Sequence, residues 1–112
     1  MTRLLFVCSR NRWRSPTAEA VFARYEGIET QSAGVSKDAD TPISAEAIEW
    51  ADLIFVMEFI HKEKLAKAFG PLLRSKRVSV LGIPDNYRFM QPELIALLEE
   101  RVRRFVDLDP NR

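Results

Sequence analysis

The sequence LLFVCSRNRWRSP at residues 4–16 predicts a buried strand, a polar loop and the start of a helix. Residues 4–7 form a short apolar run, which is typical of a strand that is covered on both faces. Ser15 and Pro16 indicate a helix start, with serine as the N-cap and proline at the first helical position. We expect this helix to continue to about Glu26. A strand, a loop and a helix in this order begin an α/β fold.

The rest of the chain predicts three more strands and three more helices. We expect the strands at Ile28–Ala33, Asp52–Met57 and Arg77–Leu81, and the helices at Ser44–Trp50, at Ile60–Phe69 and from Pro92 to just before Asp109-Pro110. Gly70-Pro71 is expected to end the second of these helices. Strands that alternate with helices predict an α/β domain: a three-layer sandwich with a central four-stranded, mainly parallel sheet covered by helices on both faces. We interpret residues 1–112 as a single domain of this kind.

Some side chains are assigned to the core or the surface from the same pattern. His61, the only histidine, lies early in a charged helix and is expected at the surface, with no partner for metal binding. Four aromatic residues are expected in the core: Trp50, Phe55, Phe69 and Phe105.

The composition is that of an ordinary globular protein. Seventeen basic residues against 16 acidic ones leave a net charge of +1, so the overall charge gives no reason to expect nucleic acid or an anionic membrane as a partner. No segment approaches roughly 18 consecutive apolar residues, and a single cysteine cannot form an internal disulfide. These features predict a cytoplasmic protein without membrane contact, in which Cys8 serves either packing or chemistry.

The loop after the first strand carries the strongest signal for chemistry. Cys8 and Arg14 stand six positions apart, so the residues between them can curl and point their amides at an anion. The positive end of the following helix favours a thiolate at Cys8 and therefore a nucleophile. Arg14 can hold two phosphoryl oxygens with its planar fork, and Ser15 can donate a hydrogen bond to the sulfur. Asp85 also follows a predicted strand, so we expect it at the same edge of the sheet as Cys8.

The pattern of this loop resembles the phosphate loop of the low-molecular-weight protein tyrosine phosphatase family. The matching residues are Val7-Cys8-x-x-Asn11-x-x-Arg14-Ser15-Pro16-x-Ala18-Glu19, and further matches are Ser32-Ala33-Gly34, Ala51-Asp52-Leu53-Ile54-Phe55-Val56-Met57-Glu58 and Asp85-x-Tyr87. The resemblance covers nearly the whole chain. It implies a cysteine-dependent phosphatase that hydrolyses phosphomonoesters, in particular protein phosphotyrosine, through a phosphocysteine intermediate.

The same resemblance implies a role for each matched residue. Cys8 would be the nucleophile, Arg14 would bind the phosphoryl group, and Asp85 would be the general acid that protonates the leaving oxygen and then activates water. Asn11 would hold the loop in shape and Ser15 would stabilise the thiolate. The full set of substrate-binding or phosphate-binding residues would be Ser9, Arg10, Asn11, Arg12, Trp13, Ser15 and Tyr87. No metal or cofactor is expected, because the loop and Arg14 carry the charge stabilisation.

The chain departs from the family pattern at several places. Arg10 stands where glycine is usual, Trp13 where many members have a second cysteine, and Asn86 where proline is usual. The segment between residues 34 and 43 is shorter than its counterpart and lacks the aromatic residue that commonly forms a wall of the phosphotyrosine site. Trp13 and Tyr87 could provide such walls instead. We therefore expect a shortened, divergent member of the family with a more open site.

Two other functions fit the same loop. An arsenate reductase on this scaffold passes electrons through additional cysteines, so an enzyme with Cys8 alone would need an external thiol. A non-catalytic module could use the arginine cluster to bind a phosphate or a nucleic-acid backbone, although binding alone requires neither Cys8 nor Asp85. The expected partner is a phosphorylated protein or a small phosphomonoester, and nucleic acid is kept only as the alternative.

Overall fold

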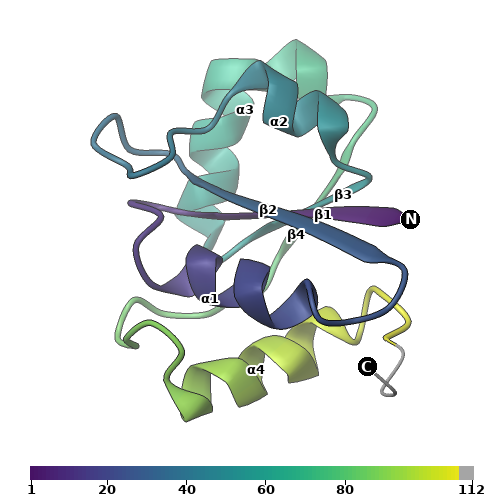
Figure 1. Cartoon of the computed structure of the whole chain (residues 1–112). Coiled ribbons are helices and arrows are strands. Elements are labelled where there is room, and N and C mark those ends of the chain that lie inside the picture. Colours follow the sequence, from purple (N-terminus) through teal and green to yellow (C-terminus); the bar gives the residue numbers. More distant parts are fainter. Residues whose placement is uncertain (109–112) are drawn as a thin grey trace.

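The computed structural model describes residues 1–108, which form one sheet between two layers of helices (Figure 1). Along the chain the elements are β1 (Thr2–Cys8), α1 (Arg14–Phe22), β2 (Ile28–Gly34), α2 (Ala45–Trp50), β3 (Leu53–Val56), α3 (Phe59–Leu73), β4 (Arg77–Val80) and α4 (Pro92–Val102). All the strand pairs of this sheet are parallel, and the strands follow the order β2-β1-β3-β4. The predicted three-layer α/β fold is confirmed, with a sheet that is parallel throughout.

The central strand β1 is buried on both faces and anchors the core. Successive side chains of a strand point to opposite faces, so Leu4, Phe6 and Cys8 face one layer while Leu5 and Val7 face the other. Helices α1 and α4 cover the first face, and α2 and α3 cover the second (Figure 1). Full burial of a large apolar side chain contributes about 1.5–3 kcal/mol. This packing fixes the position of Cys8 at the end of the strand.

The carboxyl ends of the strands form the edge at which the predicted site lies. β1 pairs with β2 along its whole length, which places Cys8 opposite Gly34, and on its other side Val7 lies opposite Val56 of β3. β4 ends beside β3, with Val80 opposite Val56. The loops that follow β1 and β4 therefore start at the same edge, at the left of the view in Figure 1.

Two helices are shorter than the sequence pattern predicts. α1 ends at Phe22 instead of about Glu26, because the amides of residues 24 and 25 bond to carbonyls three residues earlier and tighten the last turn. α4 ends at Val102, and the expected stop at Asp109-Pro110 lies outside the described residues. Within residues 1–108, no helix combines the length and the apolar character that crossing a membrane requires.

Helix α3 breaks where the sequence predicts its end, just before Gly70-Pro71, and a short second helical segment follows the break. The helix runs to Leu73 but breaks at Phe69, whose φ of −133° and ψ of 29° are not helical. The residues after this break start a new helical segment. Proline is tolerated in the first turn of a helix because the N–H that it lacks would have no partner there.

The predicted aromatic core is confirmed only in part. Phe55 is 1% exposed and stacks on Phe6, with 5.6 Å between the ring centroids. Trp50 and Phe69 are half-buried and pack against the layer of α2 and α3. The expectation for Phe105 is wrong, because its side chain is 44% exposed and contacts the core only through the Phe55 ring. Helix α4 ends at Val102, so Phe105 does not continue the apolar face of the helix.

Candidate active site

Cys8 lies at the floor of a cavity at the carboxyl edge of the sheet. It is the last residue of β1 and is 3% exposed. The cavity has a volume of about 160 Å³ and is lined by Cys8, Ser9, Arg10, Arg12, Trp13, Arg14 and Asp85. A water molecule occupies roughly 30 Å³, so the cavity has room for a phosphoryl group.

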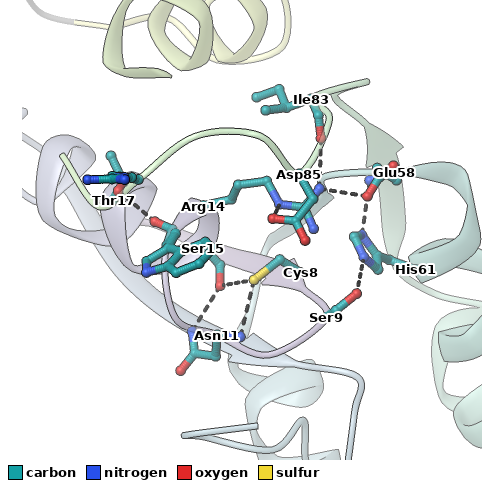
Figure 2. Close-up of polar contacts among 12 residues, drawn as sticks. Cys8, Ser9, Asn11, Arg14, Ser15, Thr17, Glu58, His61, Ile83 and Asp85 are labelled. Atoms are coloured by element: carbon teal, nitrogen blue, oxygen red, sulfur yellow. Dashed lines mark hydrogen bonds and ion pairs between the residues drawn. The ribbon is translucent and has the colours of Figure 1, made fainter. Parts of the chain in front are cut away.

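Two hydrogen-bond donors converge on the sulfur of Cys8 (Figure 2). The backbone amide of Asn11 lies 3.2 Å from Sγ, and the hydroxyl of Ser15 lies 2.9 Å from it. Asn11 Nδ2 donates to the Ser15 hydroxyl at 2.9 Å, so the hydroxyl hydrogen of Ser15 is free to point elsewhere. Two acceptors lie near this hydroxyl, Sγ of Cys8 at 2.9 Å and the Ala33 carbonyl at 3.4 Å, and the sulfur is the nearer one. Asn11 adopts the left-handed conformation, with φ of 57°, which asparagine tolerates better than most residues. These donors stabilise a negatively charged sulfur.

A short segment, residues 35–42, lies against the Cys8 loop (residues 8–15); we call this segment the strap. Its amides donate hydrogen bonds at 2.9–3.0 Å to the outer side of the loop: Val35 to the carbonyl of Cys8, Ser36 to that of Ser9 and Asp40 to that of Arg10. Because the C=O and the N–H of one peptide unit point in opposite directions, the N–H groups of residues 9–11 turn away from the strap. Of the backbone amides of residues 9–13, only that of Asn11 donates a hydrogen bond to another group of the described residues. The remaining amides are available to an anion.

Gly34 at the end of β2 allows the strap to approach the Cys8 loop. A Cβ atom at this position would lie 2.5 Å from the carbonyl oxygen of Ser9 and 2.6 Å from Cβ of Ala39. Both distances are shorter than non-bonded atoms adopt, so any side chain would push the strap away from the loop. The glycine in the matched stretch Ser32-Ala33-Gly34 thus has a packing reason.

Arg14 is the first residue of α1, and its side chain is only 3% exposed. Nη1 donates to Glu58 Oε1 at 2.7 Å and to the Ile83 carbonyl at 2.8 Å, and Nε lies 3.6 Å from Asp85 Oδ1 (Figure 2). A buried cation requires such partners. The hydrogen bonds within residues 1–108 do not engage Nη2, so part of the planar fork remains available to an anion that enters the cavity.

Asp85 lies on the loop that follows β4, which we call the Asp85 loop (residues 81–91). Its carboxylate is 58% exposed and lines the cavity. The loop is held at two points: the Ile83 amide donates to a carbonyl just after β3 at 2.8 Å, and the Met90 amide donates to Thr17 Oγ1 of α1 at 2.9 Å. These anchors keep Asp85 above the Cys8 loop although the residue itself is exposed.

His61 is fully buried, so the expectation of a surface residue is wrong. It is the third residue of α3, and its side chain folds back to the start of the helix, where Nδ1 accepts a hydrogen bond from the Glu58 amide at 3.0 Å. Nε2 lies 2.9 Å from Oγ of Ser9 (Figure 2). In a capping box the side chain at this position reaches back to the N-cap instead of outward. The charged residues farther along the helix therefore do not predict whether His61 is exposed.

The surroundings of His61 lower its pKa from 6.5 to about 4, mainly through burial and next through the positive charge of Arg14. The ring is therefore neutral at physiological pH. Because Nδ1 accepts a hydrogen bond from the Glu58 amide, the ring proton is on Nε2 and is donated to the Ser9 hydroxyl. Ser9 keeps its own hydrogen, which it can donate to a ligand in the cavity.

We expect the free energy of unfolding to fall by about 3 kcal/mol as the pH drops from 6.5 to about 4 because of His61. The pKa in the folded state lies below that in the unfolded state, so the unfolded chain binds the extra proton in this window. Stability is complete above the window and is lost as the pH falls through it. His61→Asn keeps an acceptor for the Glu58 amide but removes the titrating group. Urea denaturation of both proteins across this pH range measures the effect, and equal pH slopes would count against it.

The structure brings most of the predicted site residues together. Besides the residues that line the cavity, Asn11 and Ser15 lie buried next to the sulfur. Tyr87 does not line the cavity and packs against the layer of α1 and α4. Ser15 is not the N-cap of α1, since the helix begins at Arg14 and its N-cap, Trp13, makes no side-chain cap bond. The hydroxyl of Ser15 serves the sulfur instead.

Two residues of the site were not predicted from the sequence, Glu58 and His61. Glu58 is part of the matched pattern but carried no assigned role. The structure pairs it with Arg14 and makes it the N-cap of α3. The available signal was the three-residue spacing of Glu58 and His61 directly after a strand, which is the spacing of a capping box.

Comparison with known sequences agrees with this geometry. Residues 3–51 match the family model described as low molecular weight phosphotyrosine protein phosphatase. A curated relative, the protein-arginine-phosphatase of Bacillus subtilis (strain 168), is 32% identical over 94 residues, in a match that takes in 60% of this chain and 63% of the relative. The match therefore spans less than two thirds of the length of that relative.

Solved structures share the fold along nearly the whole chain. A cysteine-to-serine mutant of the YwlE arginine phosphatase, with a phosphorylated active-site serine, is 26% identical with a TM-score of 0.70, over 92% of this chain and 95% of the other. The low molecular weight protein tyrosine phosphatase SP-PTP from Streptococcus pyogenes has a TM-score of 0.77 at 16% identity, over 96% and 95% of the two chains, and supports the fold alone. The family model, the relatives and the geometry of the Cys8 loop agree: this chain is similar to the low molecular weight phosphotyrosine protein phosphatase family, in sequence over residues 3–51 and in fold along nearly its whole length.

Proposed function

We propose that the protein is a cysteine-dependent phosphatase that hydrolyses phosphomonoesters through a phosphocysteine intermediate. The observation that carries this proposal is the pair of donors, from Asn11 and Ser15, aimed at Sγ of Cys8 in a cavity that Arg14 and Asp85 also line. A cysteine that only packs needs neither donors directed at its sulfur nor a charged cavity beside it. The phosphorylated active-site serine in the YwlE mutant supports a covalent intermediate in that relative.

In the first step the thiolate of Cys8 attacks phosphorus. The P–S bond forms while the P–O bond to the leaving group breaks, and Asp85 as the acid gives its proton to the leaving oxygen. The amides of the Cys8 loop and the guanidinium of Arg14 hold the other phosphoryl oxygens, where negative charge gathers in the transition state. These donors are in place before the substrate arrives, which keeps the cost of reorganisation small.

In the second step water attacks the phosphorus of the phosphocysteine. Asp85, now a carboxylate, takes a proton from the water, and the P–S bond breaks to give inorganic phosphate and the Cys8 thiolate. One carboxyl group thus serves both steps, which is consistent with a position on an exposed loop that faces the cavity.

As the substrate we propose phosphotyrosine in a protein. Trp13 lines the cavity and is 48% exposed, so its indole is free to cover an aromatic ring. The protein-arginine-phosphatase among the relatives makes phosphoarginine the second candidate. The guanidinium of phosphoarginine, however, would stand close to Arg10 and Arg12, and like charges repel. Initial rates on a phosphotyrosine peptide and on the same peptide with phosphoarginine separate the two.

The alternatives from the sequence lack an observation of this kind. An arsenate-reductase-like enzyme would need an external thiol, since Cys8 is the only cysteine of the chain. A module that only binds phosphate or nucleic acid has no use for the donors at Sγ or for Asp85. The cytoplasmic location and the single domain over residues 1–112 stay predictions.

An added alcohol tests the covalent mechanism. Hydrolysis of p-nitrophenyl phosphate in water releases p-nitrophenol and phosphate in equal amounts. If a phosphocysteine forms, glycerol competes with water for it, so we expect the ratio of p-nitrophenol to phosphate to rise above one as glycerol is added. A ratio that stays at one, together with a rate that glycerol does not change, would favour direct attack by water. No release of p-nitrophenol at all would reject the proposed function.

A further inference from the structure

Two arginines of the Cys8 loop line the cavity in addition to Arg14. Nη2 of Arg10 lies 3.6 Å from Asp38 Oδ2, and Nε of Arg12 lies 3.7 Å from Asp40 Oδ1. Both carboxylates belong to the strap, and all four side chains are about half exposed or more. At these distances the pairs are ionic contacts, and within residues 1–108 neither guanidinium donates a hydrogen bond. The N–H donors of both arginines are therefore available to a ligand.

The contacts between these arginines and the strap are easily exchanged. Ion pairs between exposed side chains contribute little to stability, because water and salt screen them. An anion that forms two aligned hydrogen bonds with a guanidinium binds more strongly than a carboxylate at 3.6 Å without any. A second anionic group on a substrate could thus replace Asp38 or Asp40.

The backbone at Arg10 is held by the strap. The amide of Asp40 donates to the carbonyl of Arg10 at 3.0 Å, and the amide of Ser36 donates to that of Ser9 at 2.9 Å. Gly34 brings the strap close to the same carbonyl of Ser9. Because the chain that carries the arginines is held on its outer side, a ligand has to order only the ends of two side chains, which lowers the cost of binding.

The cavity is lined by three arginines and one carboxylate, that of Asp85. The amides of the Cys8 loop and the buried Arg14 are the groups closest to the sulfur, and they suffice to bind a phosphate dianion. Arg10 and Arg12 add two more cations at the same opening. Resting on the function proposed above, we propose that Arg10 and Arg12 bind a second anionic group, a carboxylate or a phosphate, that the substrate carries beside the phosphate attacked by Cys8.

This second site selects substrates by charge. An anionic neighbour of the phosphate meets the planar forks of Arg10 and Arg12, which match the geometry of carboxylate and phosphate oxygens. A cationic neighbour meets like charge and is rejected. In a protein substrate the second anion is an acidic residue next to the phosphorylated one, whereas in a small molecule it is a carboxylate or phosphate on the same scaffold.

Two matched substrate pairs test the proposal and separate these sources. One pair is a phosphotyrosine peptide with glutamate on both sides of the phosphotyrosine and the same peptide with glutamine. The other is meta-carboxyphenyl phosphate and its neutral carboxamide. We expect kcat/KM to be about tenfold higher for the anionic member of at least one pair, and the pair that shows the preference identifies the source. Equal kcat/KM within both pairs would overturn the proposal.

Variants assign the preference to the arginines. The double variant Arg10→Gln, Arg12→Gln should reduce the anionic-to-neutral ratio of kcat/KM to about one, whatever its rate on the neutral substrate. Asp40→Asn removes the competing carboxylate while its backbone amide stays in place, so the ratio should rise a few-fold. Lys37→Gln removes one positive charge from the strap without touching the cavity, and its ratio should match the wild type. If the double variant leaves the ratio unchanged, the assignment to Arg10 and Arg12 is rejected. If the wild type hydrolyses none of the four substrates, the proposed phosphatase activity itself is rejected.

Discussion

The Cys8→Ser variant is expected to hydrolyse p-nitrophenyl phosphate at least about 10,000-fold more slowly than the wild type. A serine hydroxyl stays protonated at neutral pH and needs a base to become a nucleophile. Among the described residues, the groups hydrogen-bonded to Sγ are the Asn11 amide, which only donates, and the Ser15 hydroxyl, which already accepts from Asn11. Within residues 1–108, no group that is hydrogen-bonded to Sγ is therefore a base for a serine at this position.

The loss in this variant should be one of chemistry and not of binding. The amides of the Cys8 loop and the guanidinium of Arg14 are unchanged, so inorganic phosphate should still bind with an affinity close to that of the wild type. Cys8→Ser replaces one small buried side chain by another, and thermal unfolding should show a folded protein. A serine variant that keeps more than about a tenth of the activity would show that Cys8 is not the nucleophile.

The part of the site that the sequence predicted is the part built from neighbours along the chain. The apolar run of β1, the turn of the Cys8 loop and the start of α1 are encoded within residues 4–16, so local pattern and spacing were sufficient. The position of Asp85 could be predicted because the carboxyl ends of parallel strands meet at one edge. Only the order β2-β1-β3-β4 was needed to bring its loop to Cys8, and the structure has that order.

The missed features depend on contacts between distant residues. His61 lies 52 positions from Ser9, and its buried position follows from the way α3 starts beside the Cys8 loop. The strap shows the same limit: its sequence predicts a polar loop, yet its amides hold the carbonyls of the Cys8 loop. Gly70-Pro71 predicts the break that α3 shows at Phe69, but not the short helical segment that follows it up to Leu73. Tertiary packing decides such cases, and a single sequence does not display it.

The ion pair between Arg14 and Asp85 links the two halves of the proposed mechanism. With Nε of Arg14 3.6 Å from Oδ1 of Asp85, the cation proposed to bind phosphate and the proposed acid lie side by side (Figure 2). Glu58 holds the same guanidinium from the end of β3 through a hydrogen bond to Nη1. A phosphoryl group that reaches Arg14 is therefore placed next to Asp85 without movement of the backbone.

The Asp85→Asn variant should lose activity in a way that depends on the leaving group. General acid catalysis contributes about 100-fold to 10,000-fold, and its full value applies when the leaving oxygen needs a proton. Tyrosine, whose hydroxyl has a pKa of about 10, leaves poorly, so we expect a loss of roughly 1,000-fold on phenyl phosphate or a phosphotyrosine peptide. p-Nitrophenol leaves readily without a proton, and its release in the first step should be affected much less.

The second step then becomes slow even with the good leaving group, because the amide that replaces the Asp85 carboxylate cannot take a proton from water. In stopped-flow measurements the variant should release a burst of p-nitrophenol equal to the enzyme concentration, followed by a slow steady state. Glu63→Gln, which removes one exposed carboxylate of α3 away from the cavity, serves as the control and should behave as the wild type. Arg14 keeps its hydrogen bonds to Glu58 and to the Ile83 carbonyl in this variant, and the carboxylate that is lost is 58% exposed, so the stability should change little. An equal loss on both substrates without a burst would mean that Asp85 only positions Arg14, because a residue that acts solely through the guanidinium weakens phosphate binding regardless of the leaving group.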